Sequence, residues 1–522
     1  MDSLRSNRAD KKVLLALRRR KRFLDLWVLG CFVAWVFSSA ALAADGETPD
    51  KRPNILLMIA DDMSWKDWGI YGNTFARTPH IDRAAAEGVR FTNAYNASPV
   101  CHPSRSALLT GQDIWRLRDA AVFGGTLHNT FDTYPSMLRE AGYTVAHSGK
   151  GWGPGFTEPG GWTVPPAGRV ARLPQILAVA EGGDRPFCFW WGTTLGHREF
   201  DYRPDGRALD TIEVPPYLPD TRAVREDFGG YYQEVEAFDA EVGKVVASLE
   251  QAGLAEDTIL IITSDHGQPW PRGKGSLYDM GTRVPLIVRW PAKIKRSRVV
   301  DDFVNFIDLA PTIVEAAGLA ASEQMTGKSL LKILLSDRSG IIEKGRDRTH
   351  FALEAHHAVG PYQAWLGYMS GRAIRTDKHL YIRNYPREGH HGWKPVQGGP
   401  SVGIMQKGMA TDETVRRNYN LCFGLRPEEE LYNVKADPYQ VHNLADDHRY
   451  AEVKNTLQQA LADYMRATDD PRAANRGEVF ARYPIWAGGS KSQMGGYNRA
   501  GQLELFHHSR YAQWMNENHP DQ

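Results

Sequence analysis

The sequence predicts an α/β fold built on a mainly parallel sheet, with a smaller domain after it. Continuous apolar runs alternate with helical patterns over the first 340 residues, and residues 54–60 (Asn-Ile-Leu-Leu-Met-Ile-Ala) are the clearest run. Such runs are typical of parallel strands that helices cover on both faces. Strands that alternate with helices imply crossover connections and therefore a parallel sheet. The chain has 522 residues, enough for more than one domain.

The predicted elements follow one another in chain order. The longest is a helix over residues 222–251, whose aromatic and valine side chains recur at helical spacing. That stripe indicates packing against the core rather than a ligand site. A helix from Thr78 has Pro79 at its first position and ends at Gly88. The other expected helices are 104–109 and 134–141, and the expected strands are 54–60, 89–95, 143–147, 186–192, 258–263 and 285–290.

The pattern changes after about residue 340. Gly, His and aromatic residues dominate up to residue 425, and a short strand (430–434) and a helix (452–465) follow. We expect a catalytic domain over residues 53–340, a smaller C-terminal α+β domain over 341–470 and a tail over 471–522. The tail is rich in Gly, Asn, Arg and His, and its pattern assigns no element.

The N-terminus predicts export. A basic segment, an apolar stretch and Ala41-Leu42-Ala43 are typical of a signal peptide, here residues 1–43, followed by a linker over 44–52. The alternative is a retained membrane anchor, because the apolar stretch is close to the length of a span. Cys31 lies in a partial lipobox, but in the middle of the apolar stretch. We therefore expect a periplasmic or secreted protein, or an anchored one if the signal is not cleaved.

Charge and cysteine content narrow the function classes. The net charge is +1, which argues against a nucleic-acid-binding protein. Removal of the signal leaves Cys101, Cys188 and Cys422, an odd number for an exported chain. Either Cys188 and Cys422 pair, or Cys188 is an inert core thiol in a strand; both interpretations stay open.

Acidic residues directly follow two of the predicted strands. Asp61-Asp62 follows the first strand, and Asp265-His266 follows the strand over 258–263. Open α/β sheets place their sites at the carboxyl ends of strands, so we expect both pairs at one edge. Three carboxylates together require a cation. Oxygen ligands favour Ca²⁺ or Mg²⁺, while the His266 nitrogen leaves Mn²⁺ or Zn²⁺ open.

Cys101-His102-Pro103-Ser104-Arg105 is the most informative segment. With Leu-Leu-Thr-Gly at 108–111, Gly149-Lys150 and the Ser-Asp-His-Gly segment at 264–267, it resembles the type I sulfatases. The resemblance implies an alkaline phosphatase-like fold. It also implies conversion of Cys101 to formylglycine by a maturation enzyme, with the hydrated aldehyde as nucleophile. A formylglycine oxygen would then ligate the cation, most often Ca²⁺.

The same resemblance suggests roles for basic residues. Arg105 orients the nucleophile, and Lys150 and Lys274 match the sulfate-binding lysines of the family. His197, in Leu-Gly-His-Arg at 195–198, matches the histidine near the leaving group and is expected to act as a general acid.

One position departs from the family pattern, which usually has a histidine two residues after the lysine of Gly-Lys. Here Trp152 stands there, and tryptophan cannot accept a proton. Either His147 or His102 serves as a substitute base, or sulfate release is slow, or the enzyme is impaired.

Within the family the chain looks most similar to the heparan N-sulfatase (sulfamidase) branch. This similarity rests on the segments at 214–220 and 269–274 and on Glu354-Ala-His356-His357. It implies that Glu354, His356 and His357 contact the sugar. It implies cleavage of the N-sulfate of N-sulfoglucosamine in a sulfated carbohydrate. An O-sulfatase, a phosphonate or phosphate ester hydrolase of the same fold, and a non-catalytic glycan-binding relative remain alternatives.

Overall fold

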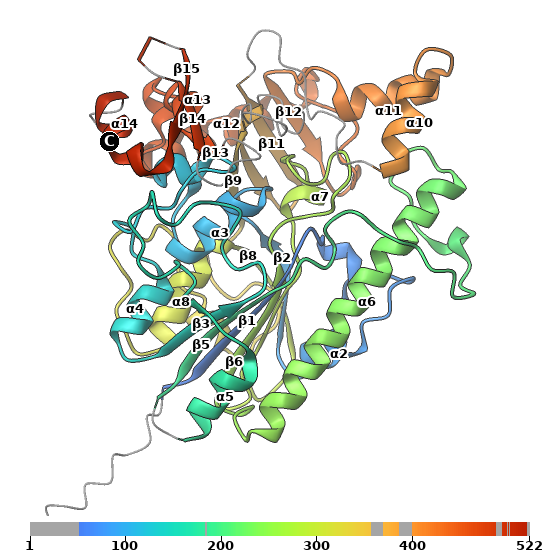
Figure 1. Cartoon of the computed structure of the whole chain (residues 1–522). Helices are drawn as coiled ribbons and strands as arrows, with labels where there is room; N and C mark the ends of the chain where they lie inside the picture. Colours follow the sequence, from blue (N-terminus) through green and yellow to red (C-terminus); the bar gives the residue numbers. More distant parts are fainter. Residues whose placement is uncertain are drawn as a thin grey trace, which may run out of the picture. The chain divides into compact units, whose positions relative to one another are not determined.

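The structure is a computed structural model that describes residues 52–182, 185–355, 369–385, 399–486, 493–497, 499–500 and 502–518 (Figure 1). The chain divides into two units, Met1–Lys51 and Arg52–Gln522, and the description concerns the second. Within these ranges, no helix has the length and apolar character needed to cross a bilayer. The expected signal peptide (1–43), Cys31, most of the linker, His356 and His357 lie outside the described residues.

Eight strands form the central sheet, in the order β4-β3-β5-β1-β6-β7-β2-β8. β7 runs antiparallel to both of its neighbours, and every other pairing is parallel, so the predicted mainly parallel sheet is confirmed. The segment between β6 and β7 contains one short helix, α7 (Asp279–Thr282), and no long crossover helix, which permits the reversed direction. The strands are β1 (Asn54–Ala60), β2 (Val89–Tyr95), β3 (Thr144–Ser148), β4 (Arg169–Val170), β5 (Phe187–Gly192), β6 (Thr258–Ser264), β7 (Leu286–Arg289) and β8 (Arg298–Asn305).

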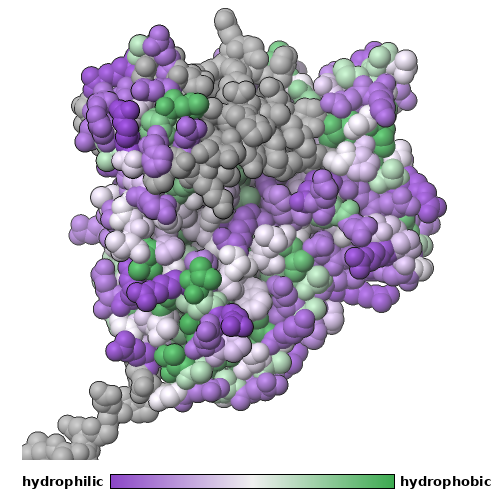
Figure 2. Space-filling model, viewed as in Figure 1, coloured by the Kyte–Doolittle hydropathy of each residue, from purple (hydrophilic) through white to green (hydrophobic). Residues whose placement is uncertain are grey.

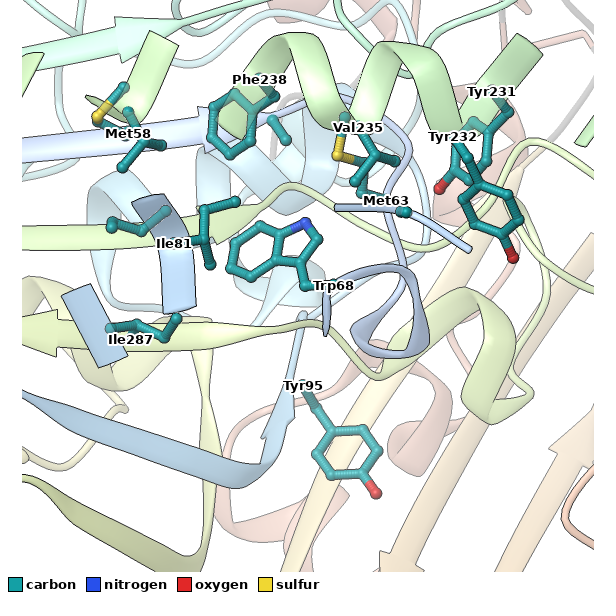
Figure 3. Packing of buried hydrophobic residues seen from close by; sticks show 14 of the residues in the cluster. Met58, Met63, Trp68, Ile81, Tyr95, Tyr231, Tyr232, Val235, Phe238 and Ile287 are labelled. Carbon is teal, nitrogen blue, oxygen red and sulfur yellow. The ribbon is translucent and has the colours of Figure 1, made fainter. Parts of the chain in front are cut away.

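Helices cover both faces of this sheet (Figure 1). Every residue of β1 is buried, and alternate side chains enter two different apolar layers. In the first layer Trp68 packs against Phe238, with ring centroids 6.0 Å apart (Figure 3). That layer contains α2 (Pro79–Ala86), α5 (Leu173–Glu181) and α6 (Arg222–Gln251); the other contains α3 (Cys101–Thr110), α4 (Tyr134–Glu140) and α8 (Leu309–Ala316).

A second, antiparallel sheet has the order β12-β11-β10-β9. α12 (Ala451–Ala467) covers it with Leu457, Leu461 and Met465. Its strands are β9 (Arg348–Ala355), β10 (Met369–Thr376), β11 (His379–Asn384) and β12 (Glu429–Asn433), and α10 (Gly399–Gly408) and α11 (Glu413–Phe423) lie between β11 and β12 in the chain.

The tail, which the sequence pattern left unassigned, forms a third small sheet. Its middle strand contains two glycines, so the apolar alternation that predicts a strand is missing. The elements are α13 (Val479–Arg482), β13 (Ile485–Trp486), β14 (Gln493–Tyr497), β15 (Leu503–His507) and α14 (Tyr511–Asn518).

The cysteines of the described residues form no disulfide, so the pairing of Cys188 with Cys422 is wrong. Cys188 is buried in β5, and the Cys422 thiol contacts the Tyr217 carbonyl at 3.5 Å. Burial raises the pKa of Cys422 to about 12, which makes it an inert thiol. On the face that Figure 2 shows, apolar side chains lie in small groups within a mainly polar surface.

Candidate active site

Two loops meet at one end of neighbouring parallel strands. Ala60 at the end of β1 pairs with Ser264 at the end of β6. Asp61-Asp62 and Asp265-His266 therefore leave the sheet side by side, and all four are fully buried. One ligand atom from each of Asp61, Asp62, Cys101 and His266 lies within 4.8 Å of the others.

Cys101 begins α3 and lies in the middle of this group. Its sulfur is 3.1 Å from His266 Nε2, 3.2 Å from Lys150 Nζ and 3.9 Å from Asp61 Oδ1. The side chain is buried, and the N-terminal end of a helix favours negative charge. Lys150 and the helix N-terminus therefore favour an anion at this position, while the Asp61 carboxylate opposes it.

Three cations, Lys150, Lys274 and Arg105, oppose three buried carboxylates, and Lys150 is the one that is partly exposed. Lys150 Nζ donates to both oxygens of Asp61 at 2.5 and 2.6 Å, and Lys274 Nζ donates to both oxygens of Asp62 at 2.9 Å. Burial by itself lowers the pKa of Lys274, but Asp62 outweighs it and the pKa is raised. An unpaired charge at this depth would cost several kcal/mol, so the lysines compensate the acidic cluster.

Asp265 orients its neighbours. Its Oδ1 accepts from the backbone N–H groups of Asp62 (3.1 Å) and His266 (2.9 Å), and its Oδ2 accepts from Arg105 Nε at 2.9 Å. Arg105 Nη1 also donates to the Gly151 carbonyl at 2.6 Å. Asp265 thus fixes Arg105 and the Asp62 peptide, and it lies outside the group of four possible ligands.

A hydrogen bond at Nδ1 of His266 orients the other ring nitrogen, Nε2. Nδ1 lies 3.0 Å from the Gly267 carbonyl, which assigns the proton to Nδ1 and turns Nε2 toward Cys101 and Asp62. Burial by itself lowers the pKa of His266, but Asp265, Cys101 and Asp62 raise it to about 9. A neutral imidazole held in this way is a ready metal ligand, and a nearby cation would favour the neutral form.

A cavity of about 610 Å³ opens onto Cys101. Its lining includes the apolar residues Val100, Phe123 and Pro154 and two acidic residues, Glu199 and Glu234. The remaining lining residues are Asp61, Cys101, Lys150, Gly153, Thr194, His197, Arg198 and Lys274. The cavity therefore combines the expected nucleophile, both lysines and the expected general acid.

The loop that carries His197 is held from two directions. His197 Nδ1 lies 2.8 Å from the Arg198 carbonyl, so its Nε2 is the nitrogen available to a ligand. Glu234 of α6 accepts a hydrogen bond from the Gly196 N–H, and burial raises the pKa of this glutamate. Arg198 forms a double ion pair with Asp227 (2.8 and 2.6 Å), so Asp227 neutralises its charge.

Trp152 is a core residue in this structure. Its Nε1 donates to Ser106 Oγ at 2.9 Å, and its ring lies edge-on to His102 with centroids 4.9 Å apart. Burial lowers the pKa of His102 to about 4. Nδ1 of His147 lies within hydrogen-bond distance of the Gly168 carbonyl, at 3.0 Å. Neither histidine is among the residues that line the cavity.

Glu354 lies away from the cavity. It is 1% exposed and accepts from Arg372 (2.7 Å) and Arg472 (2.8 and 3.0 Å). The structure therefore places Glu354 in an internal ion-pair network, and its contact with the sugar stays a prediction.

Phe123, Glu199 and Glu234 line the cavity but carry no signal in the sequence. Phe123 lies in a loop, and Glu199 follows the recognised His197-Arg198 pair by one position. Glu234 belongs to the polar side of an amphipathic helix, where an exposed glutamate is ordinary.

Comparison with known proteins identifies the family. The chain matches the sulfatase family over residues 53–161 and 170–319, and N-sulphoglucosamine sulphohydrolase, C-terminal, over residues 272–389. The chain belongs to the sulfatase family. It is therefore a hydrolase of sulfate esters or sulfamates of glycans, and the family generally uses a metal ion and formylglycine.

Individual relatives are distant but nearly full-length. An ulvan-active sulfatase from Formosa agariphila is 26% identical, over 84% of this chain and 78% of that protein. Human N-sulphoglucosamine sulphohydrolase is 28% identical, over 80% of this chain and 91% of that protein. A solved structure in complex with its substrate D-glucosamine-2-N,6-O-disulfate superposes with a TM-score of 0.59 at 20% identity, covering 80% and 98% of the two chains. At this identity the superposition establishes the fold.

Proposed function

We propose that this sulfatase removes the N-sulfate of an N-sulfated amino sugar, using a formylglycine formed from Cys101 and a bound divalent cation. One observation carries the proposal: Cys101 lies against the acidic cluster and Lys150, and with Lys274 it lines a cavity large enough for a sugar. The export expected from the N-terminus and the need for a Cys-modifying enzyme belong to the same proposal.

The residues present fit a divalent cation. Asp61, Asp62 and His266 supply two carboxylates and one nitrogen, and residue 101 projects into the same group. When bound, the cation would polarise a sulfate oxygen and stabilise the nucleophilic oxygen of residue 101. Ca²⁺ suits the carboxylates best, and Mg²⁺, Mn²⁺ and Zn²⁺ remain candidates because of His266.

The two lysines would change partners when cation and substrate bind. Each ammonium group now neutralises one aspartate, Lys150 on Asp61 and Lys274 on Asp62. A cation on those aspartates would take over the neutralisation. Both lysines line the cavity, so their ammonium groups would then be available to sulfate oxygens.

The acidic residues that line the cavity support a nitrogen leaving group. When a sulfamate S–N bond breaks, the nitrogen takes a proton and departs as an amine, and His197 Nε2 is the proposed donor of that proton. Glu199 and Glu234 favour an amine that becomes cationic and disfavour a further anion beside it. Phe123 and Pro154 offer an apolar surface to the sugar ring.

Two observations favour other functions. The relatives from Formosa agariphila are named ulvan-active, which keeps an O-sulfatase as the second candidate. Trp152, at the position of a family histidine, motivates a glycan-binding relative without turnover. A phosphate ester hydrolase has less support, because among the described residues a single group of possible metal ligands is found.

The test is a disaccharide that carries both an N-sulfate and a 6-O-sulfate. Protein co-produced with a formylglycine-forming enzyme is incubated with it, and the product is identified by mass and fragmentation. Loss of the N-sulfate alone, absent in Cys101→Ala, is the expected result. Loss of the O-sulfate would replace the N-sulfate proposal with the O-sulfatase. No loss from a broad panel, with the aldehyde present, would favour the non-catalytic relative.

A further inference from the structure

Asp62, a proposed metal ligand, has a strained backbone. Its φ of 57° lies in the left-handed region, which is unfavourable for a residue with a side chain. This conformation directs the carboxylate toward His266 and Lys274, 3.2 and 2.9 Å away. Something must hold the Asp62 backbone in place, because a relaxed φ would move the carboxylate.

Tyr231 of α6 contacts this backbone directly. Its hydroxyl oxygen lies 3.0 Å from the Asp62 carbonyl and 2.5 Å from Asp67 Oδ2. The side chain is fully buried, and its ring packs edge-on to Trp270 with centroids 4.9 Å apart. The hydroxyl therefore has a fixed position between the metal-site loop and a second acid.

Asp67 connects three segments of the chain. Besides Tyr231, it accepts from the Ser64 N–H at 2.5 Å and from the side-chain amide of Gln268. Ser64 belongs to the loop after β1, and Gln268 lies two residues after His266 in the loop after β6. Asp67 is fully buried and is not among the residues that line the catalytic cavity. Its contacts tie together the two loops that carry the proposed ligands.

We infer that Tyr231 and Asp67 are positioning residues that preorganise the Asp62 side of the metal site. This inference rests on the proposed cation site and assigns the two residues no contact with substrate. Partners that orient metal ligands typically change metal affinity by about 10- to 100-fold when they are altered. Loss of the Tyr231 hydroxyl removes the contact to the Asp62 carbonyl while the aromatic ring keeps its packing.

Tyr232 provides a matched control on the same helix. It is buried, projects from the same turn of α6 (Figure 3), and its hydroxyl bonds with Asn73 rather than with either metal-site loop. Tyr231→Phe and Tyr232→Phe therefore remove the same group from adjacent core positions. Asp67→Asn is a third variant that keeps the shape of the side chain and removes its charge.

The experiment titrates Ca²⁺ into chelator-treated full-length protein by calorimetry and measures aryl sulfate hydrolysis at low and saturating Ca²⁺. Tyr231→Phe and Asp67→Asn are expected to bind Ca²⁺ about tenfold more weakly than the wild type, and saturating Ca²⁺ restores their turnover. Tyr232→Phe should bind as the wild type does. Equal affinities for Tyr231→Phe and the wild type would overturn the inference, as would a loss of turnover that Ca²⁺ does not restore. If the wild type itself binds no Ca²⁺, the proposed calcium site fails instead.

Discussion

The molecule buries two ionic clusters that are built in different ways. At the catalytic end of the central sheet, Lys150 and Lys274 neutralise Asp61 and Asp62, and both lysines also line a cavity. Beside the second sheet, Arg372 lies between Glu354 and Asp470 and is completely buried. Arg472 donates to both carboxylate oxygens of Glu354.

The choice of cation explains the difference. The guanidinium of Arg372 donates to Asp470 at 2.5 and 3.1 Å through two nitrogens, a fixed geometry that closes the cluster. A lysine is a point charge on a flexible stem and can exchange one anion for another. We therefore expect the two lysines of the first cluster to exchange ligands, whereas the arginines of the second cluster hold the C-terminal segments together.

The largest expected effect is on chemistry at residue 101. Cys101→Ala removes the precursor of the nucleophile, and we expect the kcat/KM for an aryl sulfate to fall at least about 10³-fold. The unfolding midpoint should change little, because the helix that begins there is otherwise intact. Substantial turnover by this variant would mean that another group attacks sulfur.

Arg372→Met tests the closed cluster. The change leaves Asp470 buried without its cation, and we expect the free energy of unfolding to fall by about 3–5 kcal/mol in urea titrations. Arg383→Met is the matched control, because the Arg383–Glu428 pair is exposed and should contribute less than about 1 kcal/mol. Similar losses in both variants would contradict the distinction.

Lys274→Ala tests the exchangeable cluster. Loss of the expected sulfate contact should lower kcat/KM about 100-fold or more. Any loss of stability in metal-free protein should be recovered with Ca²⁺, since the cation would neutralise Asp62 instead. Lys66→Ala, which removes a partly exposed lysine paired with Glu213, should leave kcat/KM unchanged. An unaffected kcat/KM in Lys274→Ala would show that Lys274 only balances charge.

Asp113, near the closed cluster, provides a test by pH. Burial raises its pKa from 3.8 to about 7, and the Tyr464 hydroxyl lies 3.0 Å away. The folded state therefore holds a proton that the unfolded state releases between pH 4 and 7, so stability falls as pH rises through this window. Asp113→Asn cannot ionise, and its stability relative to wild type should rise by about 4 kcal/mol between pH 4 and 8. Parallel pH profiles of stability for Asp113→Asn and the wild type would contradict this. Asp469→Asn is the control, because the Asp469 side chain is 81% exposed.

Much of the central sheet could be predicted because burial on both faces leaves long apolar runs. The expected helix over 222–251 coincides with α6, and the strand over 258–263 with β6 apart from one residue. β8, β9, β10 and β11 were not predicted. β10 contains two arginines and a glycine among few apolar residues, because Arg372 and Arg375 are buried through ion pairs that appear only in the fold.

The candidate site shows the same limit. Residues that follow a strand or belong to a recognisable motif, such as Asp61-Asp62 and Cys101, could be selected from the sequence. Glu234 and Phe123 could not, because their place in the cavity depends on how α6 and a loop approach Cys101. Glu354 is the converse case: the motif was recognised, but the arginines that surround it are distant in sequence.

The most direct measurement follows the chemical state of residue 101. The peptide that contains it is analysed by mass spectrometry in preparations made with and without a formylglycine-forming enzyme, and aryl sulfate turnover is measured on the same samples. Turnover is expected to rise in proportion to the fraction in which the thiol has been replaced by an aldehyde. Full turnover by protein whose residue 101 is entirely unmodified cysteine would contradict it.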